Sequence, residues 1–145
     1  MAEGTRQPRG WGLAPLSYDV AMSNSDTIRD FLAAFNAKDI DRVVSFFADD
    51  AVYHNMPTTP TVGIDAIRAS IAGYTAPADV IDWQLLSISE DENGVVLTER
   101  LDRFDFGGTW VELPVMGAFE LADGKITVWR DYFDMAFFQK QMPGA

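Results

Sequence analysis

The chain has 145 residues, of which 48% are hydrophobic and 12% aromatic, a size and composition typical of one domain with a sizeable core. Its 22 acidic and 11 basic residues give a net charge of −11, which argues against nucleic acid and anionic membranes as partners. With no cysteine and one histidine, a single chain cannot form a disulfide, a thiolate nucleophile or a multi-histidine metal site.

Hydrophobic segments give no sign of a membrane span or a secretory signal. Every apolar run is interrupted by charged or turn residues well before the roughly 18 residues that a span needs. Residues 10–15 lack the continuous apolar stretch of a signal peptide. We therefore expect a soluble, cytoplasmic protein.

The first half of the chain is predicted to be mainly helical. Residues 1–24 contain several glycines and prolines without apolar periodicity, so we expect an irregular N-terminal arm before a single domain over residues 25–145. Apolar spacing and capping residues then predict three helices and one strand. The helices cover residues 25–36, 39–47 and 64–73, the strand covers 51–56, and residues 57–63 are expected to be a loop.

The second half is predicted to be a meander of four strands. Turn signals divide strand-like segments over residues 80–88, 95–104, 109–121 and 125–133. Pro114, inside the third of these, indicates a bulge or an edge position. Residues 135–142 are expected to form a short final helix. Helices followed by strands indicate an α+β fold, with a curved sheet packed against helices on one face.

Polar residues with two-residue spacing indicate a candidate site. Positions i and i+2 of a strand share a face, so Tyr53 pairs with Asn55, and Arg100 pairs with Asp102. Asp131 shares its face with two large aromatic residues. We predict that these five side chains point into one apolar pocket, whereas His54 points the other way and is more simply a packed or surface residue.

An arginine between two aspartates would provide an acid and a base together. Asp102, Arg100 and Asp131 would carry a net charge of −1, so one proton makes the group neutral and leaves one carboxylic acid and one carboxylate. The residues alone do not say which aspartate is the acid. A structural ion pair between Arg100 and Asp102, and a buried hydrogen-bonded acid at Asp131, are the simpler alternatives.

Three segments resemble those of the limonene-1,2-epoxide hydrolase family, in the same order and with similar spacing. They are residues 53–57, 98–102 and 124–134, within a resemblance that extends from about Asp26 to about Phe138. The family has a cone-like fold, in which a curved mixed or antiparallel sheet packs against N-terminal helices. Ketosteroid isomerases, scytalone dehydratase and small polyketide cyclases share it.

The resemblance implies hydrolysis of a small apolar epoxide to a vicinal diol in one step, without metal, cofactor or covalent intermediate. Asp131 would be the general base for a water molecule that Tyr53 and Asn55 also hold. Asp102 would be the general acid, and Arg100 would bridge the two acids. The family also suggests a homodimer.

The pocket wall follows from strand parity together with the resemblance. It is expected to include Phe35, Ile71, Tyr74, Phe104, Leu113, Val115, Trp129 and Phe133. Trp83 is assigned to the core. Because fold alone does not determine function, an isomerase, dehydratase or cyclase, or a non-catalytic small-molecule-binding module, remains an alternative.

Overall fold

The computed structural model describes residues 22–144 of the chain, so most of the expected N-terminal arm lies outside the described residues. Its elements, in chain order, are α1 (Asn24–Asn36), α2 (Ile40–Ser45), β1 (Phe47–Asn55), β2 (Thr61–Val62), α3 (Ile64–Thr75), β3 (Val80–Glu90), β4 (Val96–Phe106), β5 (Thr109–Ala122), β6 (Lys125–Tyr132) and α4 (Met135–Gln141). No helix in the described part is long and apolar enough to cross a membrane.

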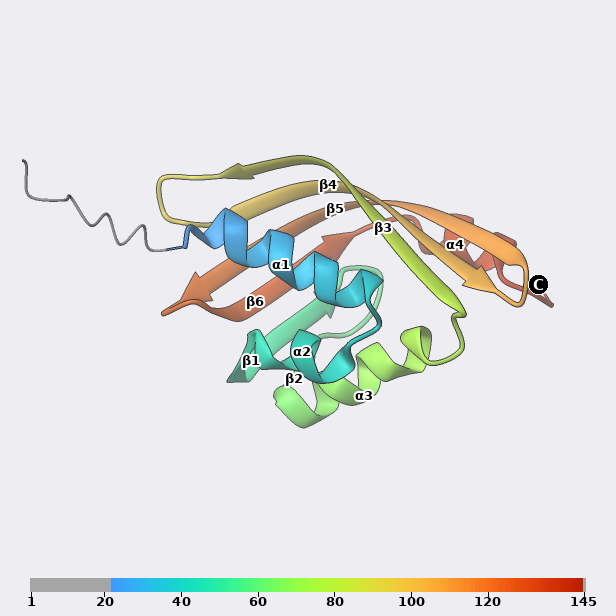
Figure 1. The fold of residues 1–145 in the computed structure, drawn as a ribbon, viewed down its shortest axis with the longest axis horizontal. Helices are drawn as coiled ribbons and strands as arrows, with labels where there is room; N and C mark the ends of the chain where they lie inside the picture. Colours follow the sequence, from blue (N-terminus) through green and yellow to red (C-terminus); the bar gives the residue numbers. More distant parts are fainter. Residues whose placement is uncertain (1–21, 145) are drawn as a thin grey trace, which may run out of the picture.

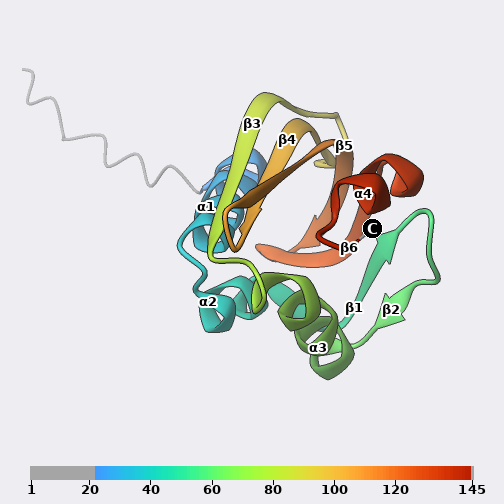
Figure 2. The same cartoon turned by 90° about the vertical axis from the view of Figure 1, so that its right-hand side faces the viewer.

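The six strands form one curled sheet that does not close into a barrel (Figure 1). Their order is β2-β1-β6-β5-β4-β3, and every neighbouring pair is antiparallel except β1 and β6, which are parallel. Helices α1 to α3 lie on the concave side of the sheet (Figure 2). The predicted meander and the α+β fold class are confirmed.

Several predicted boundaries differ from the observed ones. Helix α1 begins at Asn24, inside the expected arm, because the Ser23 side chain caps it by accepting a hydrogen bond from the Asp26 backbone. Helix α3 continues two residues beyond Gly73, where a glycine is tolerated within the last turns. Strand β2 lies within the expected loop, because two residues are too short to show alternation.

Strand β1 also begins earlier than predicted, at Phe47. A register shift between Phe47 and Val52 accommodates the exposed Asp49 and Asp50, so the acidic pair does not end the strand. Pro114 pairs with β4, while the β5 pairing with β6 starts only at Met116. Pro114 therefore has the local edge position that its missing N–H requires.

An aromatic core fixes α1 inside the sheet. The Phe31 ring is fully buried, and five other aromatic rings pack edge-on against it, those of Phe35, Phe46, Phe47, Phe119 and Trp129. Burial of such a side chain contributes about 1.5–3 kcal/mol, and edge-to-face pairs add to it. The concave face of the sheet is therefore a rigid support for the residues beside it.

Two amide side chains attach helices to strand backbones. Asn36, the last residue of α1, accepts from the Trp83 backbone N–H at 2.7 Å and donates to the Trp83 carbonyl at 3.1 Å. Gln141, the last residue of α4, makes the same two bonds with the Glu112 backbone, at 3.0 and 2.8 Å. These contacts hold α1 against edge strand β3, and α4 against β5 where β6 has ended.

Candidate active site

A buried arginine bridges two carboxylates from different strands. Arg100 of β4 donates to Asp102, two residues along, through Nε (3.0 Å) and Nη2 (2.9 Å). It donates to Asp131 of β6 through Nη2 (2.7 Å) and Nη1 (3.2 Å). The three residues are only 1%, 2% and 4% exposed, respectively. The structure thus brings together the three charged residues that the strand pattern selected.

A glycine in the strand between them makes this bridge possible. Gly117 of β5 pairs with Thr98 of β4 on one side and with Asp131 of β6 on the other. A Cβ atom at this position would lie 2.5 Å from Arg100 Nη1, 2.7 Å from Asp131 Oδ1 and 2.8 Å from Thr98 Oγ1. The absence of a side chain therefore lets Arg100 reach across β5.

Thr98 completes the arginine's hydrogen bonds, because its Oγ1 accepts from Arg100 Nη1 at 3.1 Å. Neither Thr98 nor Gly117 was among the residues predicted for the site. Alternation places Thr98 on the face of Arg100, which was a usable signal. The role of Gly117 depends on cross-strand register, which the sequence pattern does not specify.

Burial and pairing set the charge states of the cluster. Burial raises the pKa of Asp102 to about 6, although the charge and hydrogen bonds of Arg100 lower it. Burial alone would lower the pKa of Arg100, but the two carboxylates raise it well above its ordinary value. Arg100 is therefore a permanent cation, while Asp102 can hold a proton near neutral pH.

The indole N–H of Trp129 is a further hydrogen-bond donor to the Asp131 carboxylate. Its Nε1 donates to Asp131 Oδ1 at 2.7 Å, and its ring stacks on Tyr53 with 4.2 Å between centroids. Trp129 is fully buried and does not line the pocket, contrary to its predicted position in the wall. Its N–H and Arg100 fix the orientation of the Asp131 carboxylate.

The parallel pairing of β1 with β6 adds two polar residues. Tyr53 lies opposite Trp129 and Asn55 lies opposite Asp131 in this register. Burial, followed by the charge of Asp131, raises the pKa of Tyr53, so its hydroxyl stays protonated. His54 faces away from this group, and its Nε2 lies 2.9 Å from the Thr58 carbonyl oxygen.

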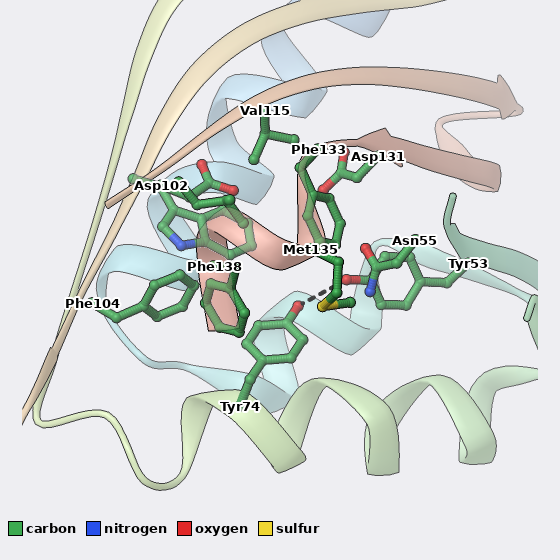
Figure 3. A pocket seen from close by; sticks show the side chains of 12 residues that line it. Tyr53, Asn55, Tyr74, Asp102, Phe104, Val115, Asp131, Phe133, Met135 and Phe138 are labelled. Carbon is green, nitrogen blue, oxygen red and sulfur yellow. Dashed lines mark hydrogen bonds between the residues drawn. The ribbon is translucent and has the colours of Figure 1, made fainter. Parts of the chain in front are cut away.

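Asp102 and Asp131 border a cavity of about 210 Å³ (Figure 3). Its other lining residues are Tyr53, Asn55, Tyr74, Trp83, Phe104, Leu113, Val115, Phe133, Met135 and Phe138. Most of this lining is aliphatic or aromatic, and the polar groups belong mainly to four of the five predicted site residues, Tyr53, Asn55, Asp102 and Asp131. Arg100 itself lies behind the surface of the cavity.

The structure places five of the eight predicted wall residues in this lining, namely Tyr74, Phe104, Leu113, Val115 and Phe133. Phe35 and Ile71, like Trp129, are fully buried core residues instead. Phe35 stacks on Trp83 with 4.2 Å between centroids, so Trp83 separates it from the cavity.

Three lining residues were missed. Trp83 was assigned to the core, but it lies opposite Asp102 in the β3–β4 register and packs its ring 5.2 Å from the Arg100 Cζ. Met135 and Phe138 belong to α4, and strand parity says nothing about where a following helix lies.

The curled α+β sheet gives the protein a cone-like fold, and a buried Asp–Arg–Asp cluster borders its apolar pocket. The model of the family described as limonene-1,2-epoxide hydrolase catalytic domain matches residues 22–143, and the chain belongs to this family. Epoxide hydrolase EphG of Mycobacterium tuberculosis is 35% identical over 113 residues, which are 74% of this chain and 71% of EphG.

Solved structures agree with this assignment. An LEH-like epoxide hydrolase from M. tuberculosis is 31% identical, with a TM-score of 0.72 over 81% of this chain and 87% of that chain. The epoxide hydrolase/cyclase-like enzyme SalBIII, described in pyran ring formation in the polyether salinomycin, is 18% identical with a TM-score of 0.71, over 78% and 92% of the two chains. The latter match shows the fold alone. The predicted family, fold class and enzymatic nature are confirmed.

Substitution of Gly117 by alanine is expected to disrupt the cluster. The added methyl group must displace Arg100 or Asp131, which should lower the free energy of unfolding by about 1–3 kcal/mol. Urea unfolding measures this change. Gly73→Ala is the matched control, because its Cβ meets nothing within 4 Å and the site lies in a helix, where alanine stabilises. Equal stability of Gly117→Ala and the wild type would contradict the close packing.

Proposed function

We propose that the enzyme hydrolyses a small apolar epoxide to a vicinal diol by general acid–base attack of water. The observation that carries this proposal is that Asp102 and Asp131, bridged by one guanidinium, both border the same apolar cavity. Epoxide opening needs an acid at the leaving oxygen and an activated nucleophile at the opposite side of the ring carbon. Two carboxyl groups on one pocket, in different protonation states, can supply both.

Asp131 is the proposed general base. Asn55 lies beside it across the β1–β6 pair, and the Tyr53 hydroxyl faces the same cavity. A hydroxyl and an amide can both donate and accept hydrogen bonds, which suits the positioning of a water molecule. Asp131 takes a proton from this water while the water oxygen attacks the epoxide carbon.

Asp102 is the proposed general acid, because burial raises its pKa to about 6 and so increases the fraction of the protonated form that can donate to the epoxide oxygen. As the carbon–oxygen bond breaks, this oxygen receives the proton of Asp102, while Asp131 receives one from water. Atoms and charges balance, because the cluster holds one proton before and after the reaction. Arg100 stays paired with both carboxylates and stabilises whichever is charged.

The chemistry as proposed uses no metal, no cofactor and no covalent intermediate. Within residues 22–144, no group of three or more histidine, cysteine, aspartate or glutamate side chains is arranged to hold a metal ion. Every proton transfer in the scheme is assigned to a side chain of the cavity. The reaction therefore depends on the relative positions of Asp102, Asp131 and the water.

The size and lining of the cavity support a small apolar substrate. At about 210 Å³ it is smaller than the roughly 300–1,000 Å³ of pockets for drug-sized ligands. The alternatives on this fold are an isomerase, dehydratase, cyclase or binding module. Tyr53 and Asn55 beside the proposed base favour hydrolysis over these, because hydrolysis is the one among these reactions that consumes a water molecule.

We also propose a homodimer located in the cytoplasm. Leu97, Met116 and Tyr132 are about half exposed, at 44%, 54% and 48%. Met116 lies opposite Tyr132 in the β5–β6 register, on the side of the sheet away from the pocket. Such neighbouring apolar side chains support the proposal of contact with a second copy.

Incubation with a panel of small epoxides tests the proposed function. We expect diol from at least one of them. Folded protein that forms no diol from any member would refute the proposal. A single turnover in isotopically labelled water should place the label in the diol at once, because water attacks carbon directly; an initially unlabelled diol would indicate an ester intermediate.

Substitution of Asp131 by asparagine should lower kcat by at least about 10²-fold, because an amide cannot accept the water proton. Circular dichroism should show an unchanged fold. Asp134→Asn is the control, since Asp134 is exposed and asparagine preserves its N-cap role. Substantial residual activity in Asp131→Asn would exclude Asp131 as the base.

The pH dependence follows from the raised pKa of Asp102. Because the acid must be protonated, kcat/KM is expected to fall about tenfold per pH unit above about pH 6. The raised pKa also means that protonated Asp102 adds to the free energy of unfolding. This contribution is fully present below the unfolded pKa of 3.8 and is lost as the pH rises through about 6. Asp102→Asn should remove that part of the pH dependence of unfolding. A kcat/KM that is flat to pH 9 would contradict the role of Asp102.

A further inference from the structure

Tyr74 places its hydroxyl group in the cavity, although the packing of the ring does not require a hydroxyl. The ring stacks against Phe35 and Trp83, with 6.4 Å between centroids in each case, and packs edge-on against Phe104. A phenylalanine would make the same ring contacts. The Tyr74 hydroxyl oxygen lies 3.3 Å from that of Tyr53, and this is its only hydrogen bond within residues 22–144 (Figure 3).

The two hydroxyls can share only one hydrogen bond, so one donates and the other accepts. Burial raises the pKa of both, and each therefore keeps its proton. If Tyr53 donated to Tyr74, the Tyr74 proton would have no acceptor among the described residues. If Tyr74 donates, its proton is satisfied and the Tyr53 proton is free to point into the cavity. Each arrangement leaves one hydroxyl proton without an acceptor among the described residues. The second is favoured because the free proton is then that of Tyr53, which lies beside Asn55 and the Asp131 carboxylate, whereas the Tyr74 ring is surrounded by aromatic rings.

The direction of the Tyr74–Tyr53 hydrogen bond determines how Tyr53 can bind the water molecule. Water has two protons to donate and two lone pairs that can accept. Its protons can go to the Asp131 carboxylate and the Asn55 amide oxygen. The Tyr53 hydroxyl then donates to one lone pair, and the other lone pair remains for the epoxide carbon. If Tyr53 instead donated to Tyr74, its oxygen could only accept from the water. It would then compete with Asn55 for the same water proton.

We propose that Tyr74 is a positioning residue that donates to Tyr53 and thereby fixes the direction of the Tyr53 hydroxyl toward the attacking water. This inference rests on the proposed epoxide hydrolysis. Tyr74 does not touch the water itself in this scheme and acts through Tyr53.

Tyr74→Phe removes only the hydroxyl. We expect kcat to fall about tenfold, the effect of one lost hydrogen bond, with KM within about twofold of the wild type. Ser87→Ala removes a hydroxyl from an exposed residue outside the cavity and should leave kcat unchanged. Thermal unfolding verifies that both variants are folded.

A double-mutant cycle shows whether Tyr74 acts through Tyr53. In a Tyr53→Phe background, the additional Tyr74→Phe change should cost no further activity, because the hydroxyl that Tyr74 orients is already gone. An equal loss in both backgrounds would overturn the inference. So would an unchanged kcat in Tyr74→Phe, or a raised KM with full kcat, which would indicate direct substrate binding.

The failure of this inference can be told apart from that of the proposed function. Wild-type protein that yields no diol from any epoxide refutes both. Wild-type protein that yields diol, together with a fully active Tyr74→Phe variant, refutes only the role of Tyr74.

Discussion

The structure depends on the pairing of one buried guanidinium with two carboxylates. Removal of the guanidinium from such a cluster is expected to cost about 3–5 kcal/mol, because the buried carboxylates would be left without a counter-charge. The neighbouring residues are arranged accordingly. Gly117 leaves room for Arg100 to cross β5, Trp129 donates to Asp131, and Thr98 accepts the remaining Arg100 proton. Three neighbouring strands must therefore be in register before the site exists, which ties the proposed chemistry directly to correct folding of the sheet.

The parallel contact between β1 and β6 connects this cluster to the first half of the chain. All other neighbouring strands in the sheet are antiparallel, and β3 to β6 follow one another through short turns. The β1–β6 pair instead joins segments more than 70 residues apart and places Asn55 opposite Asp131. A slip of one residue in this pair would turn Tyr53 and Asn55 to the other face of the sheet. The pair is thus a structural contact and also the one that places the proposed water-holding groups beside the proposed base.

Strand parity predicted that Arg100, Asp102 and Asp131 lie together at one cavity, but not the residues that support them. The two-residue spacing of Arg100 and Asp102 correctly places both on one face, and turn signals correctly divide the meander. The family resemblance supplied the assignment of acid and base, which spacing left open. The role of Gly117 could not be predicted from the sequence, because it depends on the register of β5 with both β4 and β6. Phe35 and Ile71 were wrongly predicted to line the cavity. Helix periodicity identifies the face that points inward, but it does not show that a strand residue such as Trp83 lies between that face and the cavity.

The two sides of the cavity are anchored very differently. Asp102 and Asp131 lie on central strands backed by the aromatic core, whereas Met135 and Phe138 come from α4, which has no buried residue and whose end is attached to β5 through the Gln141 amide. Substitutions in α4 are therefore expected to change the shape of the cavity at less cost in stability than substitutions in the core. This helix is therefore the part of the cavity wall that can vary in evolution while Asp102, Arg100 and Asp131 keep their positions.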